Sequence, residues 1–118
     1  MRNLIRIFLV TLITLGYTSC EDTSKSSTCD VANPAEDLSW LKTMIESWEA
    51  NSTIYTYQYV LQGTYLGQTV FIAANCCPFC DSYFPIFNCE GEGLEGVIFQ
   101  DIKNLKTIWK PDDSQCTL

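Results

Sequence analysis

The spacing of the cysteines restricts what this chain can fold into more than any other feature. Seven cysteines occur in 118 residues, and four of them lie within residues 76–89. There Cys77-Pro78-Phe79-Cys80 forms a C-x-x-C pair behind an apolar run. A domain this small buries only a modest core and gains stability from cross-links. The sequence therefore indicates a domain held together by disulfides, unless the C-x-x-C pair serves a metal or a redox reaction.

The N-terminus has the features of an export signal. Residues 1–6 carry two arginines, and the apolar run at 7–15 is too short to span a membrane. Leu15-Gly16-Tyr17-Thr18-Ser19-Cys20 resembles a bacterial lipobox. The resemblance implies that residues 1–19 are a removed lipoprotein signal peptide and that Cys20 carries a palmitate-type lipid anchor. The alternative is an ordinary signal cleavage that leaves Cys20 as a free thiol.

Counting the cysteines supports the lipid anchor. Setting Cys20 aside leaves six of the seven, an even number that can pair completely. Six cysteines allow fifteen connectivities, and spacing alone does not choose among them. Cys80 and Cys89 bracket a hairpin-like loop, so we expect them to pair, with Cys29 and Cys116 taking Cys76 and Cys77.

Two other roles for the cysteines remain open. The segment 70–85, VFIAANCCPFCDSYFP, resembles the active-site segment of thioredoxin-like proteins, which implies an oxidoreductase using Cys77 and Cys80. That chemistry requires Cys77 at a helix N-terminus, but Pro85 and the aromatic residues before it do not favour a helix. A zinc site usually has a second cysteine pair or histidines, and the chain has no histidine. We therefore expect no metal and no cofactor.

The periodicity of apolar residues predicts an α+β domain. Asn33-Pro34-Ala35-Glu36 is typical of a helix start, and an apolar stripe continues a predicted amphipathic helix over 34–50. Alternation and apolar runs predict four or five mostly antiparallel strands, with a turn at Leu66-Gly67. The helix should lie across one face of the sheet. The predicted strands cover residues 53–62, 68–74, 83–88, 97–99 and 106–110.

Charge and composition exclude several functions. Residues 20–28 contain no apolar residue apart from Cys20 and predict a disordered tether, followed by one compact domain over 29–118. After position 19 there are five basic and fourteen acidic residues, a formal charge of −9. No basic run is present to meet nucleic acid, and the absence of histidine removes the usual hydrolytic triads.

Tyr55, Tyr57 and Tyr59 alternate along the predicted strand over 53–62. The face that they form either stacks on a glycan or peptide or covers the helix.

Most of residues 29–116 also resembles a group of small uncharacterised Gram-negative bacterial lipoproteins. The residues that carry this resemblance are 36–41, 65–71, the double cysteine 76–77 and 88–91. It implies one compact exported domain. Glu21-Asp22, directly behind Cys20, resembles the acidic patches of some outer-membrane lipoproteins, so we expect the anchor to lie in the cell envelope at the outer membrane, on either side of it. We expect a non-catalytic binding or envelope-structural module whose protein or glycan partner is open. The alternatives are an envelope thiol-disulfide oxidoreductase and a small inhibitor of a hydrolase or protease.

Overall fold

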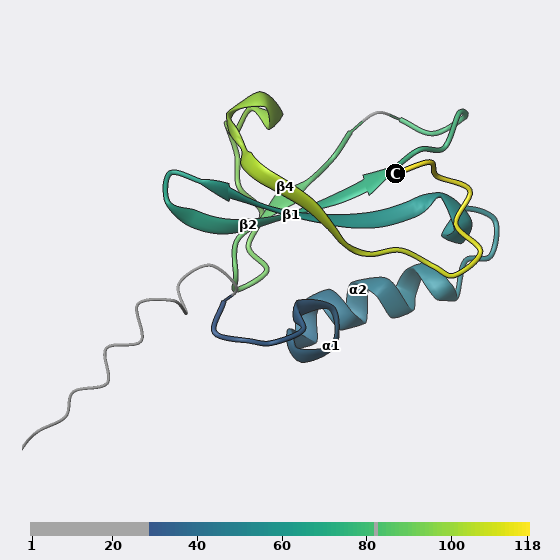
Figure 1. Cartoon of the computed structure of the whole chain (residues 1–118). Coiled ribbons are helices and arrows are strands. Elements are labelled where there is room, and N and C mark those ends of the chain that lie inside the picture. The colour runs from purple at the N-terminus through teal and green to yellow at the C-terminus, as the bar shows by residue number, and fades with distance from the viewer. Residues whose placement is uncertain (1–28, 82) are drawn as a thin grey trace, which may run out of the picture.

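The chain folds into two helices and a four-stranded antiparallel sheet over residues 29–81 and 83–118, which the computed structural model describes (Figure 1). The signal segment 1–19, Cys20 and the tether over 20–28 lie outside these residues, so what the sequence predicts for them stays a prediction. Among the described residues no helix is long and apolar enough to cross a membrane. The elements are α1 (Pro34–Asp37), α2 (Ser39–Glu49), η2 (Tyr55–Tyr57), β1 (Gln58–Tyr65), β2 (Gln68–Asn75), β3 (Ile86–Phe87), η3 (Phe99–Asp101) and β4 (Lys103–Trp109).

The β1–β2 hairpin organises the sheet. The two strands pair without interruption from Gln58 opposite Asn75 to Tyr65 opposite Gln68. Leu66 and Gly67 close the hairpin with φ angles of 47° and 77°, and two positive φ angles match the right-handed twist of the strands. The predicted turn and the predicted strand over 68–74 are confirmed. The strand order β3-β2-β1-β4 then leaves β3 and β4 at the two edges.

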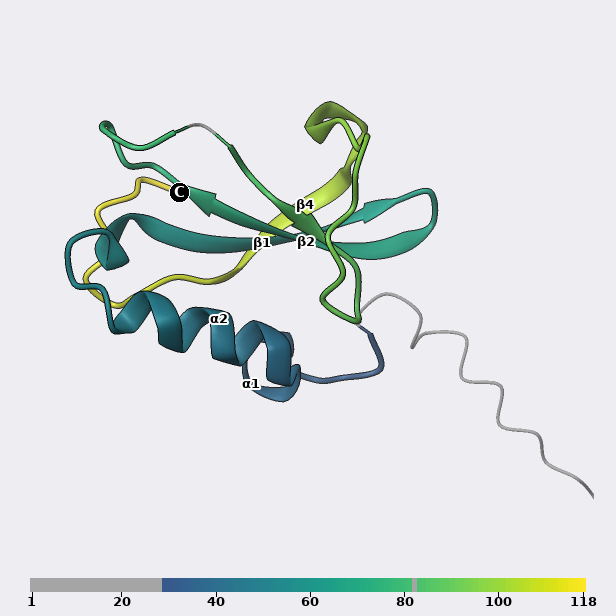
Figure 2. The same ribbon diagram turned by 180° about the vertical axis from the view of Figure 1, so that it is seen from behind.

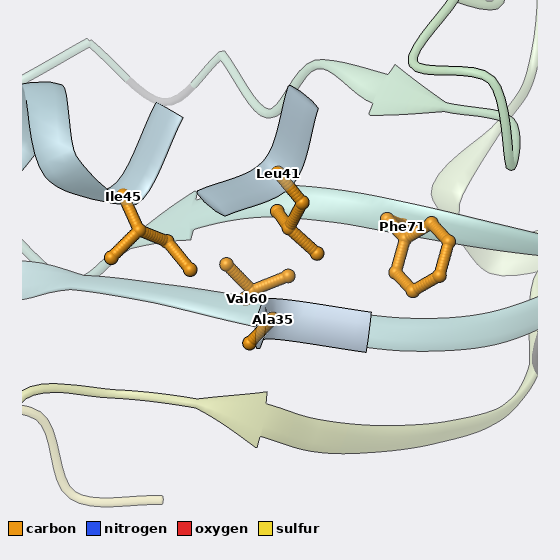
Figure 3. Packing of buried hydrophobic residues seen from close by; sticks show 5 residues of the cluster. All are labelled: Ala35, Leu41, Ile45, Val60 and Phe71. Atoms are coloured by element: carbon orange, nitrogen blue, oxygen red, sulfur yellow. The ribbon is translucent and has the colours of Figure 1, made fainter. Parts of the chain in front are cut away.

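One face of the sheet packs against the helices (Figures 1 and 3). Leu41 and Phe71 are fully buried there, and Trp40 stacks edge-on against Phe71 with ring centroids 5.7 Å apart. Burying one large apolar side chain contributes about 1.5–3 kcal/mol, so this cluster supplies much of the stability of a small domain. Its buried members are Ala35, Leu41, Ile45, Val60 and Phe71.

The opposite face of the sheet is covered by irregular chain. Ile72 lies one residue from Phe71 and therefore belongs to this second cluster, together with Val70 and Ala74. The covering side chains come from the segment between β2 and β4, and in the view from behind parts of this segment run over the sheet on the side away from α2, whereas its loop after β3 descends toward the helices (Figure 2). They are Phe84, Ile86, Leu94, Val97 and Ile102.

The helical region differs from the continuous helix predicted over 34–50. Leu38 has extended backbone angles, φ −87° and ψ 108°, and separates α1 from α2. Pro34 and Ala35 are both buried, and α1 lies against β4. The break turns the first helical turn toward the edge of the sheet. This tertiary contact replaces the local continuity that the periodicity alone favoured.

Four of the five predicted strands also change. The strand predicted over 53–62 begins only at Gln58, because residues 55–57 form a 3₁₀ turn. The one predicted over 83–88 shrinks to Ile86–Phe87, since Pro85 has no N–H and joins the ladder only by accepting a bond from the Ala73 N–H at 3.1 Å. No strand forms over 97–99: Val97 packs onto the sheet face instead of pairing at an edge. The last strand, β4, begins three residues before the predicted 106.

Candidate functional site

All six cysteines of the described residues are joined in three disulfides. Cys29 pairs with Cys89 across a separation of 60 residues, with 5.6 Å between Cα atoms. Cys76 pairs with Cys116 across 40 residues, with 5.7 Å between Cα atoms. Cys77 pairs with Cys80, with 5.3 Å between Cα atoms. None of these six sulfurs is left as a thiol.

The predicted Cys80–Cys89 bridge is wrong, and so is the predicted bridge from Cys29 to Cys76 or Cys77. The chain turns sharply after β2: the Cys77 N–H donates to Asn75 Oδ1 at 3.3 Å, and the Cys80 N–H donates to the Cys77 carbonyl at 3.4 Å. This turn brings Cys77 and Cys80 together. Cys89 is held elsewhere. Cys116 pairs with Cys76, which is one of the two partners expected for it.

Cys89 lies beside the helices. Its carbonyl accepts a hydrogen bond from Trp40 Nε1 at 2.8 Å, and Gly91 lies directly under the Trp40 ring. A Cβ at Gly91 would come within 2.6 Å of Trp40 Cγ, and the φ of Gly91 is +80°, so only glycine fits at this approach. The Cys29–Cys89 bridge thus fastens the start of the domain next to α2.

The loop over 77–80, hereafter the C-x-x-C loop, is a turn and not a helix start. Cys77 is 8% exposed, whereas Phe79 at the tip is 67% exposed and stacks edge-on against Tyr57 with ring centroids 5.8 Å apart. A reactive thiolate is usually stabilised by a helix N-terminus or a cation, and here the acidic Asp81 follows Cys80 directly. The loop therefore lacks the helix that makes such pairs strongly nucleophilic.

The three tyrosines predicted to share one face do not do so. Tyr55 and Tyr57 lie on the 3₁₀ turn, and Tyr59 lies on β1. Tyr55 stacks on Trp109 at 6.0 Å and Tyr57 on Phe79 at 5.8 Å. Tyr59 packs against the second core cluster, on the face of the sheet away from the helices. The common tyrosine face suggested for residues 55–59 therefore does not form, because the strand that would carry the alternation begins only at Gln58.

Tyr55 belongs instead to an aromatic group at the far end of β4. Trp109 contacts both Tyr55 and Trp48, whose ring centroid lies 5.8 Å away. Partial burial, reinforced by the carboxylates of Glu49, Asp113 and Asp112 and by a hydrogen bond to Glu49, raises the pKa of Tyr55 above its ordinary value of 10.0. The Tyr55 hydroxyl is therefore protonated at neutral pH.

Beside this group lies a shallow hollow of about 190 Å³. Its floor is apolar, with Ala35, Ile45 and the Trp109 ring, and its rim is mostly acidic. Lys42, also on the rim, pairs with Glu36 at 3.7 Å between exposed atoms. The hollow is therefore an apolar depression with a charged rim. The rim residues are Glu36, Lys42, Glu46 and Glu49.

Among residues 29–81 and 83–118 no group of three or more histidine, cysteine, aspartate or glutamate side chains is placed to hold a metal ion.

Two features of the structure were not predicted from the sequence: the aromatic group around Trp109 and the cationic character of β4. The second had a visible signal, because Lys103, Lys106 and Lys110 are three of the seven basic residues and fall within eight positions.

Comparison of the chain with protein-family models, curated proteins and solved structures found no match to any of them.

Proposed function

We propose that this chain is an exported, lipid-anchored domain that is cross-linked by disulfides and acts by binding, without catalysis, in a bacterial envelope. The observation that carries the proposal is that Cys29, Cys76, Cys77, Cys80, Cys89 and Cys116 are all consumed in bridges. No described cysteine is left to pair with Cys20. The cysteine preceded by the lipobox-like segment is therefore the one without a disulfide partner among them, as a lipidated cysteine would be.

The two long bridges fit a structural role. Each closes a loop of 40 residues or more, which in the chain-entropy view stabilises the fold by about 4 kcal/mol. Domains of this size are stable by about 5–15 kcal/mol in total. Losing either bridge would therefore remove a large share of the stability. Disulfides of this kind belong to an oxidising compartment, which supports export.

The test of the proposal is a count of thiols and a search for lipid on the full chain purified from a bacterial membrane. We expect no free thiol under denaturing conditions, and a mass for the N-terminal peptide that matches a diacylglyceryl cysteine at position 20. The Cys20→Ser variant should keep all three bridges and lose the lipid. One free thiol per chain with no added lipid would contradict the anchor.

One observation favours a second candidate, an envelope thiol-disulfide oxidoreductase. Cys77 and Cys80 pair with each other, as the two sulfurs of a redox-active C-x-x-C pair do, and not with distant partners. This bridge closes a separation of only three residues, so it contributes least to chain-entropy stabilisation and is the one most easily spared for chemistry. The exposed Phe79 between the two sulfurs would then be the first side chain a substrate meets.

The reduction of insulin by dithiothreitol separates the two candidates. For a binding domain, the full chain should not accelerate the reaction above a control with denatured chain. An oxidoreductase would accelerate it, and the Cys77→Ser and Cys80→Ser variants would abolish the acceleration. A Cys80→Ser variant that accumulates mixed disulfides with envelope proteins would also establish the redox role.

A further inference from the structure

β4 has one open side. It pairs with β1, and the strand order places no described strand on its other flank. Residues 103–107 are all exposed, and in Figure 1 the strand crosses the near side of the molecule. An open edge presents backbone N–H and C=O groups that can pair with another strand. With seven residues, β4 is long enough to receive one.

The charge of the domain changes sign at this strand. The described residues contain twelve acidic and four basic side chains, and three of the four basic ones are Lys103, Lys106 and Lys110. Among the described residues the one ion pair joins Lys42 to Glu36, so these three lysines face solvent without a carboxylate partner. The edge is therefore a cationic stripe on an otherwise acidic molecule.

The two faces of the edge differ. The pairing sets Lys106 opposite Gln62 and Lys103 opposite Thr64. Because paired residues share a face, these two lysines lie on the sheet face that carries Val60 and the helices. On the other face Leu105 is 39% exposed and covers Gly63, where a Cβ would come within 3.0 Å of Leu105 Cδ2.

The turn that precedes β4 extends the apolar side of this edge. Ile98 is 59% exposed and Phe99 is 38% exposed, both within five residues of the start of the strand. Lys103 and Lys106 share a face although they are three positions apart, because the register with β1 shifts between them, where Asn104 has a φ of 55°. A strand docked along β4 would therefore meet lysines on one face and Leu105 on the other.

We infer, resting on the proposed binding function, that the open edge of β4 receives an extended segment of a partner protein in which acidic and apolar side chains alternate. The added segment forms main-chain hydrogen bonds with β4, its acidic side chains meet Lys103 and Lys106, and its apolar side chains meet Leu105. Charge selects this occupant over a second copy of the chain, because pairing two β4 strands would set lysines against lysines.

The test uses the full chain with its disulfides intact and a fluorescent nine-residue peptide of alternating glutamate and valine, followed by fluorescence anisotropy. Binding should be saturable and should weaken as salt is raised. A peptide of alternating lysine and valine is the matched control and should not bind. Two further peptides carry backbone N-methyl groups on alternate residues, one on the odd-numbered residues and the other on the even-numbered residues. Only the peptide whose methyl groups lie on the edge that pairs with β4 should lose binding.

Two variants of equal charge change locate the site. Lys106→Glu should weaken the glutamate–valine peptide about tenfold, since an exposed attraction becomes a repulsion of similar size. Lys42→Glu, on α2, should leave the affinity within twofold. Near-ultraviolet circular dichroism checks that both variants are folded.

Three results would overturn the inference. They are no binding of the glutamate–valine peptide, equal binding of both N-methylated peptides, or equal loss in Lys106→Glu and Lys42→Glu. In each case the lysines serve only to keep the edge from pairing. Failure of the proposed function is read separately, in the thiol count and the insulin assay, neither of which depends on the peptide.

Discussion

β2 and β4 pair with opposite sides of β1 and have opposite surroundings. In β2 every residue from Thr69 to Ala74 is buried, between the helices on one face and irregular chain on the other. In β4 every residue from Lys103 to Thr107 is exposed. Stability is therefore concentrated on one side of β1, and the other side is free to contact partners. The two properties are separated by a single strand.

A disulfide links the ends of these two strands. Cys76 directly follows β2, and Cys116 lies seven residues after β4. Both also lie against the Tyr57 carbonyl, which accepts a hydrogen bond from the Cys76 N–H at 3.0 Å and lies 3.3 Å from Cys116 Sγ. The chain beyond the exposed strand is thus fastened to the chain beyond the buried one. This linkage holds β4 in place, although β4 itself contributes little to the core.

The largest expected effect comes from truncating the buried strand. Phe71→Ala should lower the free energy of unfolding by about 3–5 kcal/mol, because it removes a fully buried ring and leaves a cavity under Trp40. Leu105→Ala on β4 is the matched control and should change it by about 1 kcal/mol or less. Urea denaturation followed by tryptophan fluorescence measures both. Equal losses in the two variants would break the contrast between the strands.

The next effect concerns the bridge between the strand ends. Replacing Cys76 and Cys116 together by serine should lower the free energy of unfolding by about 2–4 kcal/mol, since a loop of 40 residues is released in the unfolded chain. The Cys77→Ser/Cys80→Ser double variant releases a separation of three residues and should cost less than half as much. If the order were reversed, the C-x-x-C loop would be the main structural bridge and the redox candidate would lose its support.

A smaller effect is expected where β1 meets β4. Gly63 has no room for a side chain: a Cβ there would collide with the Ile102 side chain and come within 3.0 Å of the Lys103 carbonyl. Gly63→Val should therefore push β4 outward and destabilise the domain by about 1–3 kcal/mol. Hydrogen exchange should show the loss of protection in β4 and not in β2. Uniform loss across both strands would mean that β4 is part of the same cooperative core.

The smallest effect is a pH dependence at the end of β4. The pKa of Tyr55 is raised in the folded domain by burial and by Glu49 and other carboxylates, so folding favours its protonated form. Its contribution is complete below the unfolded pKa of about 10 and is lost as the pH rises through the higher folded value. Unfolding free energy should therefore fall above pH 10 more steeply in the wild type than in Tyr55→Phe. Identical slopes in denaturant titrations from pH 8 to 11 would remove Tyr55 from this account.

Local signals in the sequence were enough for the hairpin and for the buried strand. Leu66-Gly67 marks the turn, and the apolar run at 68–74 is typical of a strand covered on both faces. The break at Leu38 has no local signal, because the apolar stripe continues through it, and it follows from the contact between α1 and β4. The tyrosine alternation over residues 55–59 is likewise misleading, because Tyr55 and Tyr57 lie on a 3₁₀ turn before the strand begins at Gln58.

Sequence patterns alone favoured bridges among the six cysteines after Cys20 and predicted an α+β domain with a mostly antiparallel sheet. These follow from parity, periodicity and turn residues, which act over a few neighbouring positions. Only the tertiary structure decided which sulfurs meet, because Cys29 and Cys89 come together through the packing of Trp40 on the chain around residue 90. It also decided that the lysines of β4 lie on an open edge, since strand order depends on contacts between segments far apart in the chain.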